Sequence, residues 1–456
     1  AKFSAILLLP MCALAAAVWL AGRVSTEGWL RPLLRLVRSA ALHAIVAWAL
    51  IWTFFDFRFG PFAPALADGA NYNHGWAWMT EGLGWPRPVL LGLQKWHVLP
   101  DAFLYGFTFV LQFAKQRGAF LNGEYSIHGW TVFFPYAFLV KTTLPFLALV
   151  VVGAIAAGRK LGAAGGRLAW TRVRPFTPLI ALFVVYWATS LASHLNIGHR
   201  HILPTYPVLF IVAGAFGAWL EWRRPLAAGF VAAMVVWHAA ESWRIRPHYL
   251  AYFNPIAGGP AGGWRHLVDS SIDWGQDLPG LRAWLETHAP REKVFLSYFG
   301  TGDPVYEGIR ATLMPTLPEA GPPRPWYALS AGVYAISATM LQQVYSPVSG
   351  HWSLAREKEY QDLRVLEPQF LEYQNDPVRR AALLREAPVE QWNNGWKRYE
   401  LLRFARLCTY LRVRRTDAAV GYSILIYRVT QPEIDVAVNG SLRDWTAAIE
   451  AAVRND

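Results

Sequence analysis

Six apolar runs constrain the fold of this chain more than any other feature of its sequence. A helix needs about 20 predominantly apolar residues to cross the hydrocarbon core of a bilayer. The runs lie at residues 3–21, 39–56, 131–157, 176–194, 203–220 and 225–240. We therefore expect residues 1–243 to form a polytopic α-helical membrane domain with about six transmembrane helices.

The distribution of charge predicts how these helices are oriented. Residues 1–243 carry 19 Lys and Arg against 8 Asp and Glu, whereas residues 244–456 carry 24 against 23. Eleven of the 19 basic residues lie in three links between the runs, at 22–38, 158–175 and 221–224. Since cytoplasmic loops are enriched in Lys and Arg, we expect these links in the cytoplasm and the outer loop 57–130 on the opposite side. Membrane topology thus explains the basic composition without a nucleic-acid partner.

Residues 244–456 have the pattern of a soluble, mixed α/β domain, which the same topology places outside the cytoplasm. The β-branched and aromatic composition of strands occurs at 293–299, 326–337 and 422–429. The segment 277–288 is predicted to be a helix with Asp277 as its N-cap and Pro279 in its first turn. Residues 369–412 are expected to be mostly helical.

The outer loop contains an apolar segment, residues 99–115, that is too short to span a bilayer. Its length is typical of an interfacial or re-entrant helix. Near the end of this loop, the sequence GEYSIHGW (123–130) holds Glu124 and His128. Both side chains are candidates for orienting an acceptor or for proton transfer. The alternative is that the segment only fixes the start of the third span.

The sequence NIGHRHILPTYP (196–207) places an arginine between two histidines where the fourth and fifth apolar runs almost meet. Arg200 is always charged and can make a forked contact to a phosphate, while His199 and His201 can donate or accept hydrogen bonds. This turn lies on the side where the fewest basic residues are expected. It is either a solvated turn or a binding site for an anion at the lipid surface, and we favour the second interpretation.

Lys141 is expected about ten residues inside the third apolar run, where a charge is costly and usually faces a cavity or a partner. The nearby Thr142, Thr143 and Pro145 predict a polar, broken helix at this point. The alternative is that the long side chain extends toward the outer rim of the membrane.

The sequence DSSIDWGQDL (269–278) is a candidate carbohydrate site. The acid Asp273 and the amide Gln276 can bond hydroxyl groups, and the ring of Trp274 can stack on a sugar. The alternative, which we favour, is that the same side chains cap a helix and build a turn.

The sequence indicates no cofactor and no metal site, and it leaves dependence on a divalent metal open. The two cysteines, Cys12 and Cys408, stand in different settings, which argues against a disulfide. A zinc site from His194, His199 and His201 is conceivable but has no recognised spacing. Phosphate-binding glycine loops, nucleophile elbows and HExxH motifs do not occur.

Several segments together resemble a known family. They are KFSAILLLP (2–10), GEYSIHGWTVFFPYAFLVKTTLP (123–145), NIGHRHILPTYP (196–207), YFNPIAGGPAGGWRHLVDSSIDWGQDL (252–278) and GYSILIYRVT (421–430). The chain resembles, over most of its length, bacterial polytopic glycosyltransferases of the GT-C superfamily. These are the phospholipid-carrier-dependent enzymes related to protein O-mannosyltransferases and aminoarabinose transferases.

The resemblance implies a multi-pass enzyme of the bacterial inner membrane that transfers a sugar from a polyprenyl-phosphate carrier. The acceptor would be a glycan, a lipid or a protein on the outer face. In that family, the catalytic acidic residue lies in the first outer loop, and this sequence is expected to begin after it. We therefore assign no catalytic residue within the chain and expect that residue upstream of Ala1. Arg200 is the expected ligand of the donor phosphate, with Lys141, His199 and His201 as helpers.

Two other functions remain open from the sequence. A non-enzymatic transporter or sensor with an outer domain is the first, although transport predicts charged residues near several span midplanes and only Lys141 fits that pattern. A ligase that joins lipid-linked glycans is the second.

Overall fold

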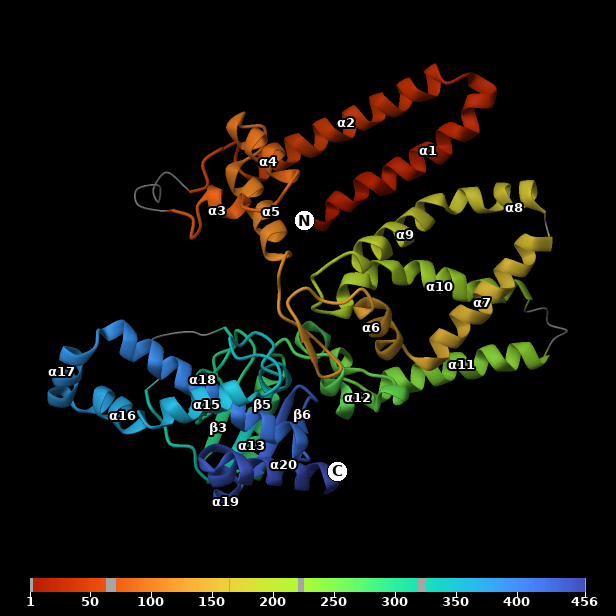
Figure 1. The fold of residues 1–456 in the computed structure, drawn as a ribbon. Helices are drawn as coiled ribbons and strands as arrows, with labels where there is room; N and C mark the ends of the chain where they lie inside the picture. The colour runs from red at the N-terminus through yellow and green to blue at the C-terminus, as the bar shows by residue number, and fades with distance from the viewer. Residues whose placement is uncertain (1–2, 63–70, 164, 220–224, 319–324, 456) are drawn as a thin grey trace.

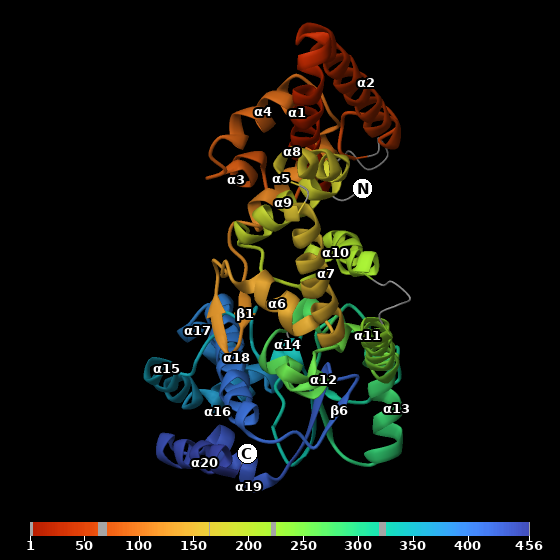
Figure 2. The ribbon, with the colours of Figure 1, turned by 90° about the vertical axis from the view of Figure 1, so that its right-hand side faces the viewer.

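The computed structural model describes residues 3–62, 71–163, 165–219, 225–318 and 325–455. Long helices form one part of the molecule, and an α/β domain forms the other (Figure 1). Seen from the side, α1 and α2 lie at one end, then α7, α9 and α10, then the short helix α6, and finally the α/β domain (Figure 2). The expected combination of membrane helices with a mixed domain is therefore present.

Five helical segments in the described ranges are long and apolar enough to cross a membrane, judged by length and composition. They are Ser4–Val24, Leu30–Phe54, Leu144–Ala163, Leu168–Leu191 and Pro225–Arg244. The corresponding elements are η1 (Phe3–Leu7) with α1 (Leu8–Glu27), α2 (Leu30–Phe54), α7 (Leu144–Ala163), α8 (Gly166–Val173) with η3 (Arg174–Phe176) and α9 (Thr177–Leu191), and α11 (Pro225–Arg244).

The predicted span at 203–220 is not one of these five, so the expected count of six is not confirmed. Residues 203–219 of this span form the end of the 3-10 helix η4 (His199–Thr205), then α10 (Tyr206–Gly214), then the 3-10 helix η5 (Ala215–Trp219). Its last residue and the predicted link at 221–224 lie outside the described residues. Pro204 lies inside η4 and Pro207 in the first turn of α10. Because proline has no N–H to donate and its ring crowds the preceding turn, a regular α-helix cannot run through this region unbroken.

The predicted span at 131–157 is divided into two helices, as the polar residues near Lys141 predicted. The first, α6 (Phe133–Lys141), ends at an extended Thr142, and α7 begins at Leu144. Lys141 is therefore the last residue of α6, directly before the predicted break. The break leaves the carbonyl groups at the end of α6 in need of new partners.

The outer loop is largely helical where it is described. It contains α3 (Trp76–Thr80), α4 (Pro86–Lys95), α5 (Asp101–Phe113) and a hairpin of β1 (Ala119–Leu121) with β2 (Glu124–Ser126). The apolar segment at 99–115 forms α5, whose 13 residues confirm a helix too short to span a bilayer. Its placement at the membrane surface stays a prediction.

A five-stranded sheet in the order β4-β3-β5-β7-β6 organises the α/β domain. Its strands are β3 (Val294–Ser297), β4 (Thr312–Leu313), β5 (Gly332–Ser337), β6 (Ala418–Val420) and β7 (Ile424–Val429). The three strands β4, β3 and β5 are parallel, whereas β7 is antiparallel to both β5 and β6. Each of the three predicted strand segments contains one of these strands.

Helices cover both faces of this sheet. Successive residues of a strand point to opposite faces, so each buried strand places side chains against the helices on both sides. Leu296 and Ala335 pack on one face with α13 (Leu278–His288). Phe295 and Ile336 pack on the other with α18 (Val389–Val413).

The remaining elements are short turns and the helices around α18. They are η6 (Tyr249–Ala251), η7 (Pro255–Ala257), α12 (Gly259–Gly262), η8 (Gly263–Arg265), η9 (Asp269–Ser271), α14 (Ala338–Leu341), α15 (Leu354–Arg364), α16 (Glu367–Asn375), α17 (Pro377–Glu386), α19 (Gln431–Ile434), the π-helical η10 (Asp435–Asn439) and α20 (Leu442–Asn455).

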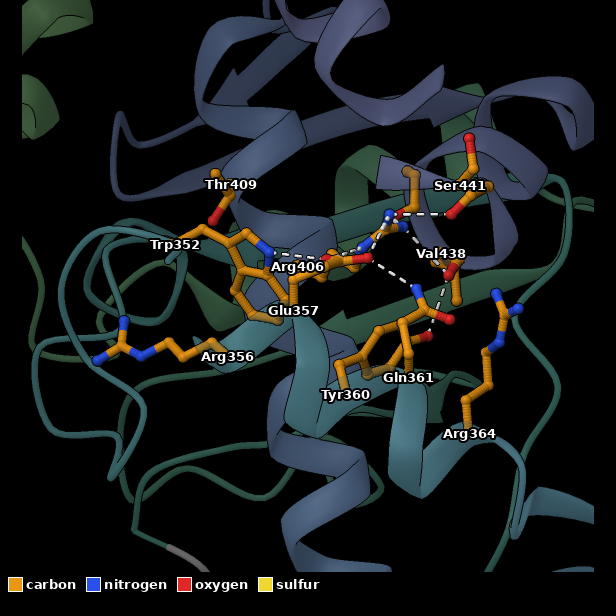
Figure 3. Close-up of polar contacts among 12 residues, drawn as sticks. Trp352, Arg356, Glu357, Tyr360, Gln361, Arg364, Arg406, Thr409, Val438 and Ser441 are labelled. Atoms are coloured by element: carbon orange, nitrogen blue, oxygen red, sulfur yellow. Dashed lines mark hydrogen bonds and ion pairs between the residues drawn. The ribbon is translucent and has the colours of Figure 1, made fainter. Parts of the chain in front are cut away.

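One buried ion pair joins three of the helical elements of the α/β domain, α18, α15 and η10 (Figure 3). Arg406 of α18 is fully buried and makes two bonds to Glu357 of α15, at 3.0 and 3.3 Å. Its guanidinium also donates to carbonyl groups of η10 and to that of Gly440, just before α20. Trp352 and Gln361 donate to the Glu357 carboxylate at 2.9 and 2.7 Å. Both charges are therefore fully surrounded by hydrogen-bonding partners, the condition under which burial of an ion pair is tolerated.

The main apolar core combines residues from both sides of position 243, where the sequence predicts the boundary between two domains. It contains Phe120 of β1, Phe134 of α6 and Ile202 of η4 together with Phe404 and Leu407 of α18. The outer segments before residue 243 thus pack on the α/β domain. The division at residues 243 and 244 stays a prediction.

Candidate functional site

The candidate segments 123–130, 196–207 and 269–278, which are far apart in the sequence, lie close together in the structure. They meet near α6, next to the α/β domain (Figure 2). The buried amide of Asn196 accepts a hydrogen bond from the backbone N–H of Trp130 at 2.5 Å. A ring nitrogen of His194 lies 2.6 Å from the carbonyl oxygen of His128. The segment 123–130 is therefore held against the turn at 196–207.

The same turn also contacts the loop that begins at Asp269. The hydroxyl of Ser270 donates to the carbonyl of Ile197 at 2.7 Å. A methyl group at Gly198 would overlap the Ser270 side chain, so glycine is required for this close approach. The structure thereby brings together two candidate segments that are far apart in the sequence.

Arg200 is exposed and lies over the ring of Trp274. Its guanidinium carbon is 4.4 Å from the ring centroid, within the range of a cation–π interaction. The Trp274 side chain is 50% exposed. Within the described ranges, Arg200 makes no hydrogen bond or ion pair, so its N–H donors remain available to a ligand. Stacking on an aromatic ring fixes the plane of these donors.

Lys141 binds the backbone of the loop that carries Trp274. Its ammonium group donates to the carbonyl oxygens of Leu250 at 2.7 Å and Ser271 at 2.6 Å, and it lies 4.2 Å from the ring centroid of Phe253. An ammonium group has three N–H donors, so one remains after these two bonds. Burial lowers the pKa of Lys141 to about 7. Lys141 therefore has a positioning role, and the side chain turns toward backbone carbonyls instead of extending to the rim.

His199 belongs to a hydrogen-bonded chain between η4 and the break after α6. Its Nε2 lies 2.8 Å from the hydroxyl of Tyr206, which lies 2.6 Å from the hydroxyl of Thr142. Burial, together with the charge of Lys141, lowers the pKa of His199 to about 3, so its ring is neutral near pH 7. His201 is half-buried, with its ring edge-on to Phe134 at 6.2 Å. Of the four residues predicted to bind phosphate, Arg200 is thus the one with an exposed side chain.

The side chains of the DSSIDWGQDL loop are used mainly to build the loop itself. Gln276 accepts from the backbone N–H of Trp274 at 2.7 Å and donates to Ile272 and Asp277. Asp273 is fully buried and accepts from the backbone N–H of Gly275 at 3.1 Å. Burial raises the pKa of Asp273 well above its ordinary value. This geometry supports the turn-building alternative for Asp273 and Gln276, and a role of the exposed Trp274 ring toward a sugar stays a prediction.

Asp277 precedes α13 as predicted, but its carboxylate does not cap that helix. The carboxylate instead accepts from the hydroxyl of Ser423 at 2.6 Å, at the start of β7. The predicted helix is confirmed and Asp277 is its N-cap residue, but the side chain makes no capping hydrogen bond because a tertiary partner binds the carboxylate.

Three residues near the site were not selected as candidates from the sequence. The hydroxyl of Tyr345 donates to Asp269, and Arg117 lies 3.9 Å from the same carboxylate and over the Tyr345 ring. Burial raises the pKa of Asp269. Asp269 is the first residue of the candidate segment DSSIDWGQDL (269–278). The sequence around Arg117 and Tyr345, in contrast, contains no motif that points to a functional role.

Glu124 and His128 lie on the hairpin side of the site. Glu124 is exposed on β2, with its carboxylate 3.8 Å from a ring nitrogen of His351. The exposed His128 ring is edge-on to His194. Contacts of these two residues therefore fix the segment, and their proposed roles toward an acceptor stay predictions.

In the part of the chain that the structure describes, no three His, Cys, Asp or Glu side chains gather as a metal site. His194, His199 and His201 thus do not form the zinc site considered above. Cys12 is exposed, Cys408 is buried, and both are free thiols.

No protein-family model, curated protein or solved structure matches this chain. A functional conclusion therefore depends on the residues of the chain itself.

Proposed function

We propose that this protein is a membrane glycosyltransferase that transfers a sugar from a polyprenyl-phosphate carrier to an acceptor on the outer face of the membrane. The observation that carries the proposal is the exposed guanidinium of Arg200, which is stacked on Trp274 and makes no hydrogen bond or ion pair within the described residues. A cation held this way is suited to an incoming anion, because its donors need no rearrangement before binding.

The position of Arg200 favours a lipid phosphate as that anion. Arg200 belongs to η4, which leads directly into α10. Together with α7, α9 and α11, α10 belongs to the layer of long helices, called the helix layer below. Opposite ends of that layer lie next to the α/β domain and next to α8, which belongs to the basic link at 158–175 (Figure 1). If the basic links are cytoplasmic, Arg200 lies near the outer headgroups, where a carrier phosphate is found.

The chemistry assigns distinct roles to the residues at the site. Departure of the carrier phosphate needs preorganised donors for its charge, which Arg200 supplies. The half-exposed ring of Trp274 can stack on the transferred sugar. Lys141 and His199 hold the two segments that carry these groups. Asp273 is buried and Asp269 is bonded to Tyr345, so neither serves as the base for the acceptor in this proposal.

The test is donor binding by the Arg200→Ala variant in lipid nanodiscs, measured with a polyprenyl-phosphate sugar. Loss of hydrogen bonds to a charged group of this kind weakens binding about 10- to 100-fold. Arg200→Lys should recover part of the affinity because it keeps the charge but not the fork. Arg282→Ala is the control, since Arg282 is exposed on α13 and pairs with Glu286. Unchanged donor affinity in Arg200→Ala would contradict the proposal.

A further inference from the structure

A stripe of exposed apolar side chains follows α4 in the outer loop. Trp85 directly precedes this helix, Val89 lies within it, and Trp96 directly follows it. Positions 85, 89, 92 and 96 have the spacing that places residues on one face of a helix. The side chains of Trp85 and Trp96 are 82% and 77% exposed, and that of Val89 is 52% exposed. Exposed apolar surfaces of this kind mark a contact with a partner or a membrane.

The other side of α4 packs on the protein. Leu90 is buried, and the amide of Gln94 donates to the buried carboxylate of Asp101 in α5 at 3.0 Å. Both positions lie away from the stripe on the helix circumference. α4 is therefore held in one orientation, and its two tryptophans remain on the open side.

The stripe on α4 is more open than the apolar surface of α5, the helix that the sequence marked as interfacial. The most exposed apolar side chains of α5, Phe109 and Val110, are both 42% exposed. Residues 86–95 contain no long apolar run, so the sequence alone does not single out α4.

Two hydrogen bonds fix the position of this stripe relative to α2. The indole N–H groups of Trp48 and Trp52 both donate to the carbonyl oxygen of Val98, at 2.7 and 3.1 Å. α2 ends at Phe54, so both indoles lie in its last two turns. Trp96 is two residues before Val98 and therefore lies near the end of a helix that is long enough to cross a membrane. The headgroups of a bilayer lie at the ends of the helices that cross it.

We propose that the stripe on α4 lies in the headgroup region of the bilayer that α2 crosses. Tryptophan favours this region because its apolar body contacts acyl chains while its indole N–H stays near water. Lys95 is exposed at the end of α4, with its ammonium group 6.0 Å from the ring centroid of Trp96. Its long stem allows this charge to reach lipid phosphates. A lipid surface fits better than a protein partner because the stripe adjoins the end of a membrane-length helix.

The lipid contact of α4 is connected to the α/β domain through the rest of the outer loop. The hairpin that follows α5 places Phe120 in the same apolar core as Phe404 of α18. A methyl group at Gly118 would overlap the carbonyl oxygen of Val344, so the chain before the hairpin is also packed closely on this domain. α4 thus anchors at the membrane surface a loop that also holds the α/β domain. The proposal does not depend on glycosyl transfer, because it follows from α2 and α4.

The experiment measures quenching of a fluorescent label by nitroxide lipids, with the whole chain in nanodiscs. Cys12→Ser removes the exposed native thiol, and Cys408 is buried and stays. In that background, Val89→Cys carries a nitrobenzoxadiazole label on the stripe. Val378→Cys is the control, because it is an exposed position of α17, at the end of the α/β domain that lies away from the helix layer (Figure 1).

We expect the label at position 89 to emit at shorter wavelength and to be quenched by nitroxide lipids. A nitroxide on the headgroup should quench it more than a nitroxide at the middle of the acyl chain, because the stripe lies at headgroup depth. The label at position 378 should not be quenched. Trp85→Ser combined with Trp96→Ser should reduce quenching at position 89, since the tryptophans anchor the helix.

Four results would contradict this proposal. A label at position 89 that no nitroxide lipid quenches would show that the stripe faces water or protein. Stronger quenching by the mid-chain nitroxide would place α4 in the hydrocarbon core, and equal quenching at position 378 would show that the effect is not specific to the stripe. Unchanged quenching in the double serine variant would overturn the anchoring role of the tryptophans. Trp85→Cys supplies the same reading where the Val89→Cys protein does not fold.

Discussion

The guanidinium carbon of Arg200 lies 4.4 Å from the centre of the Trp274 ring. Arg200 comes from the turn that leads into α10, and Trp274 comes from the loop before α13. Their contact joins the end of the helix layer to the α/β domain. It also keeps an exposed cation in one place without neutralising it, because an aromatic ring attracts a cation but carries no net charge.

Removal of the ring should weaken the site without removing its charge. We expect Trp274→Ala to reduce affinity for a polyprenyl-phosphate sugar about two- to fivefold, since an exposed cation–π contact contributes about 0.5–1 kcal/mol. Trp274→Phe should retain most of the affinity. Titration of the donor in nanodiscs measures both variants, and an alanine variant equal to the wild type would show that the stack has no part in binding.

The glycine at position 198 should be intolerant of even a small side chain. Gly198→Ala places a methyl group against Ser270, and we expect a loss of about 1–3 kcal/mol in stability, as for other overpacked sites. Ser270→Gly in the same chain removes the obstructing hydroxyl and should restore part of that loss. A double-mutant cycle of thermal unfolding measures the coupling between the two positions. Additive effects would show that the two segments do not touch.

His199 should make the protein less stable in acid. Burial and the charge of Lys141 lower the pKa of His199 from 6.5 to about 3, so the unfolded chain takes up a proton first as the pH falls. The contribution of neutral His199 is complete above about pH 6.5 and is lost below it, by up to about 1.4 kcal/mol per pH unit. Melting curves of the wild type and His199→Gln, recorded between about pH 7.5 and about pH 4.5, should diverge.

In this comparison the wild type should lose stability relative to His199→Gln at the acid end. The buried carboxyl of Asp273 acts in the opposite direction, because its raised pKa favours the folded state as the pH falls. The difference between the two proteins cancels that contribution. Parallel curves over the whole range would contradict burial of a neutral His199.

The two glutamates of α15 should differ in their effect on stability. Glu357→Ala leaves the buried Arg406 without its charged partner and should cost about 3–5 kcal/mol (Figure 3). Glu359→Ala is the matched control, because the pair of Glu359 with Arg398 is 39% and 36% exposed and should contribute less than about 1 kcal/mol. Denaturant unfolding of both variants provides the comparison. Similar losses would show that the two pairs are equally solvated.

The membrane helices and several strands were predictable because their signals are local. A run of about 20 apolar residues favours a spanning helix whatever surrounds it. The segments at 293–299 and 422–429 contain β3 and β7 for a similar reason, since strand composition is read over a few residues. The break after Lys141 was also visible, because threonines and a proline weaken a helix where they stand.

The predicted span at 203–220, which is not confirmed, contains features that hydropathy leaves out. Hydropathy counts apolar residues, but Pro204 and Pro207 change the hydrogen bonding of the backbone without changing the count. Asp277 shows a limit of local reasoning at a helix start: its sequence position is that of a cap, yet Ser423 of a distant segment binds the carboxylate.

The sequence by itself determined that this chain has apolar helices of membrane-spanning length, an α/β second half and a small set of polar segments worth examining. Only the tertiary structure decided what those segments do to one another. It buried Asp273, turned Lys141 toward the carbonyl of Ser271 and left Arg200 exposed on Trp274. The physical reason is that helix length and strand composition depend on neighbours in the chain. The burial and pairing of a charge depend instead on which distant segments pack around it.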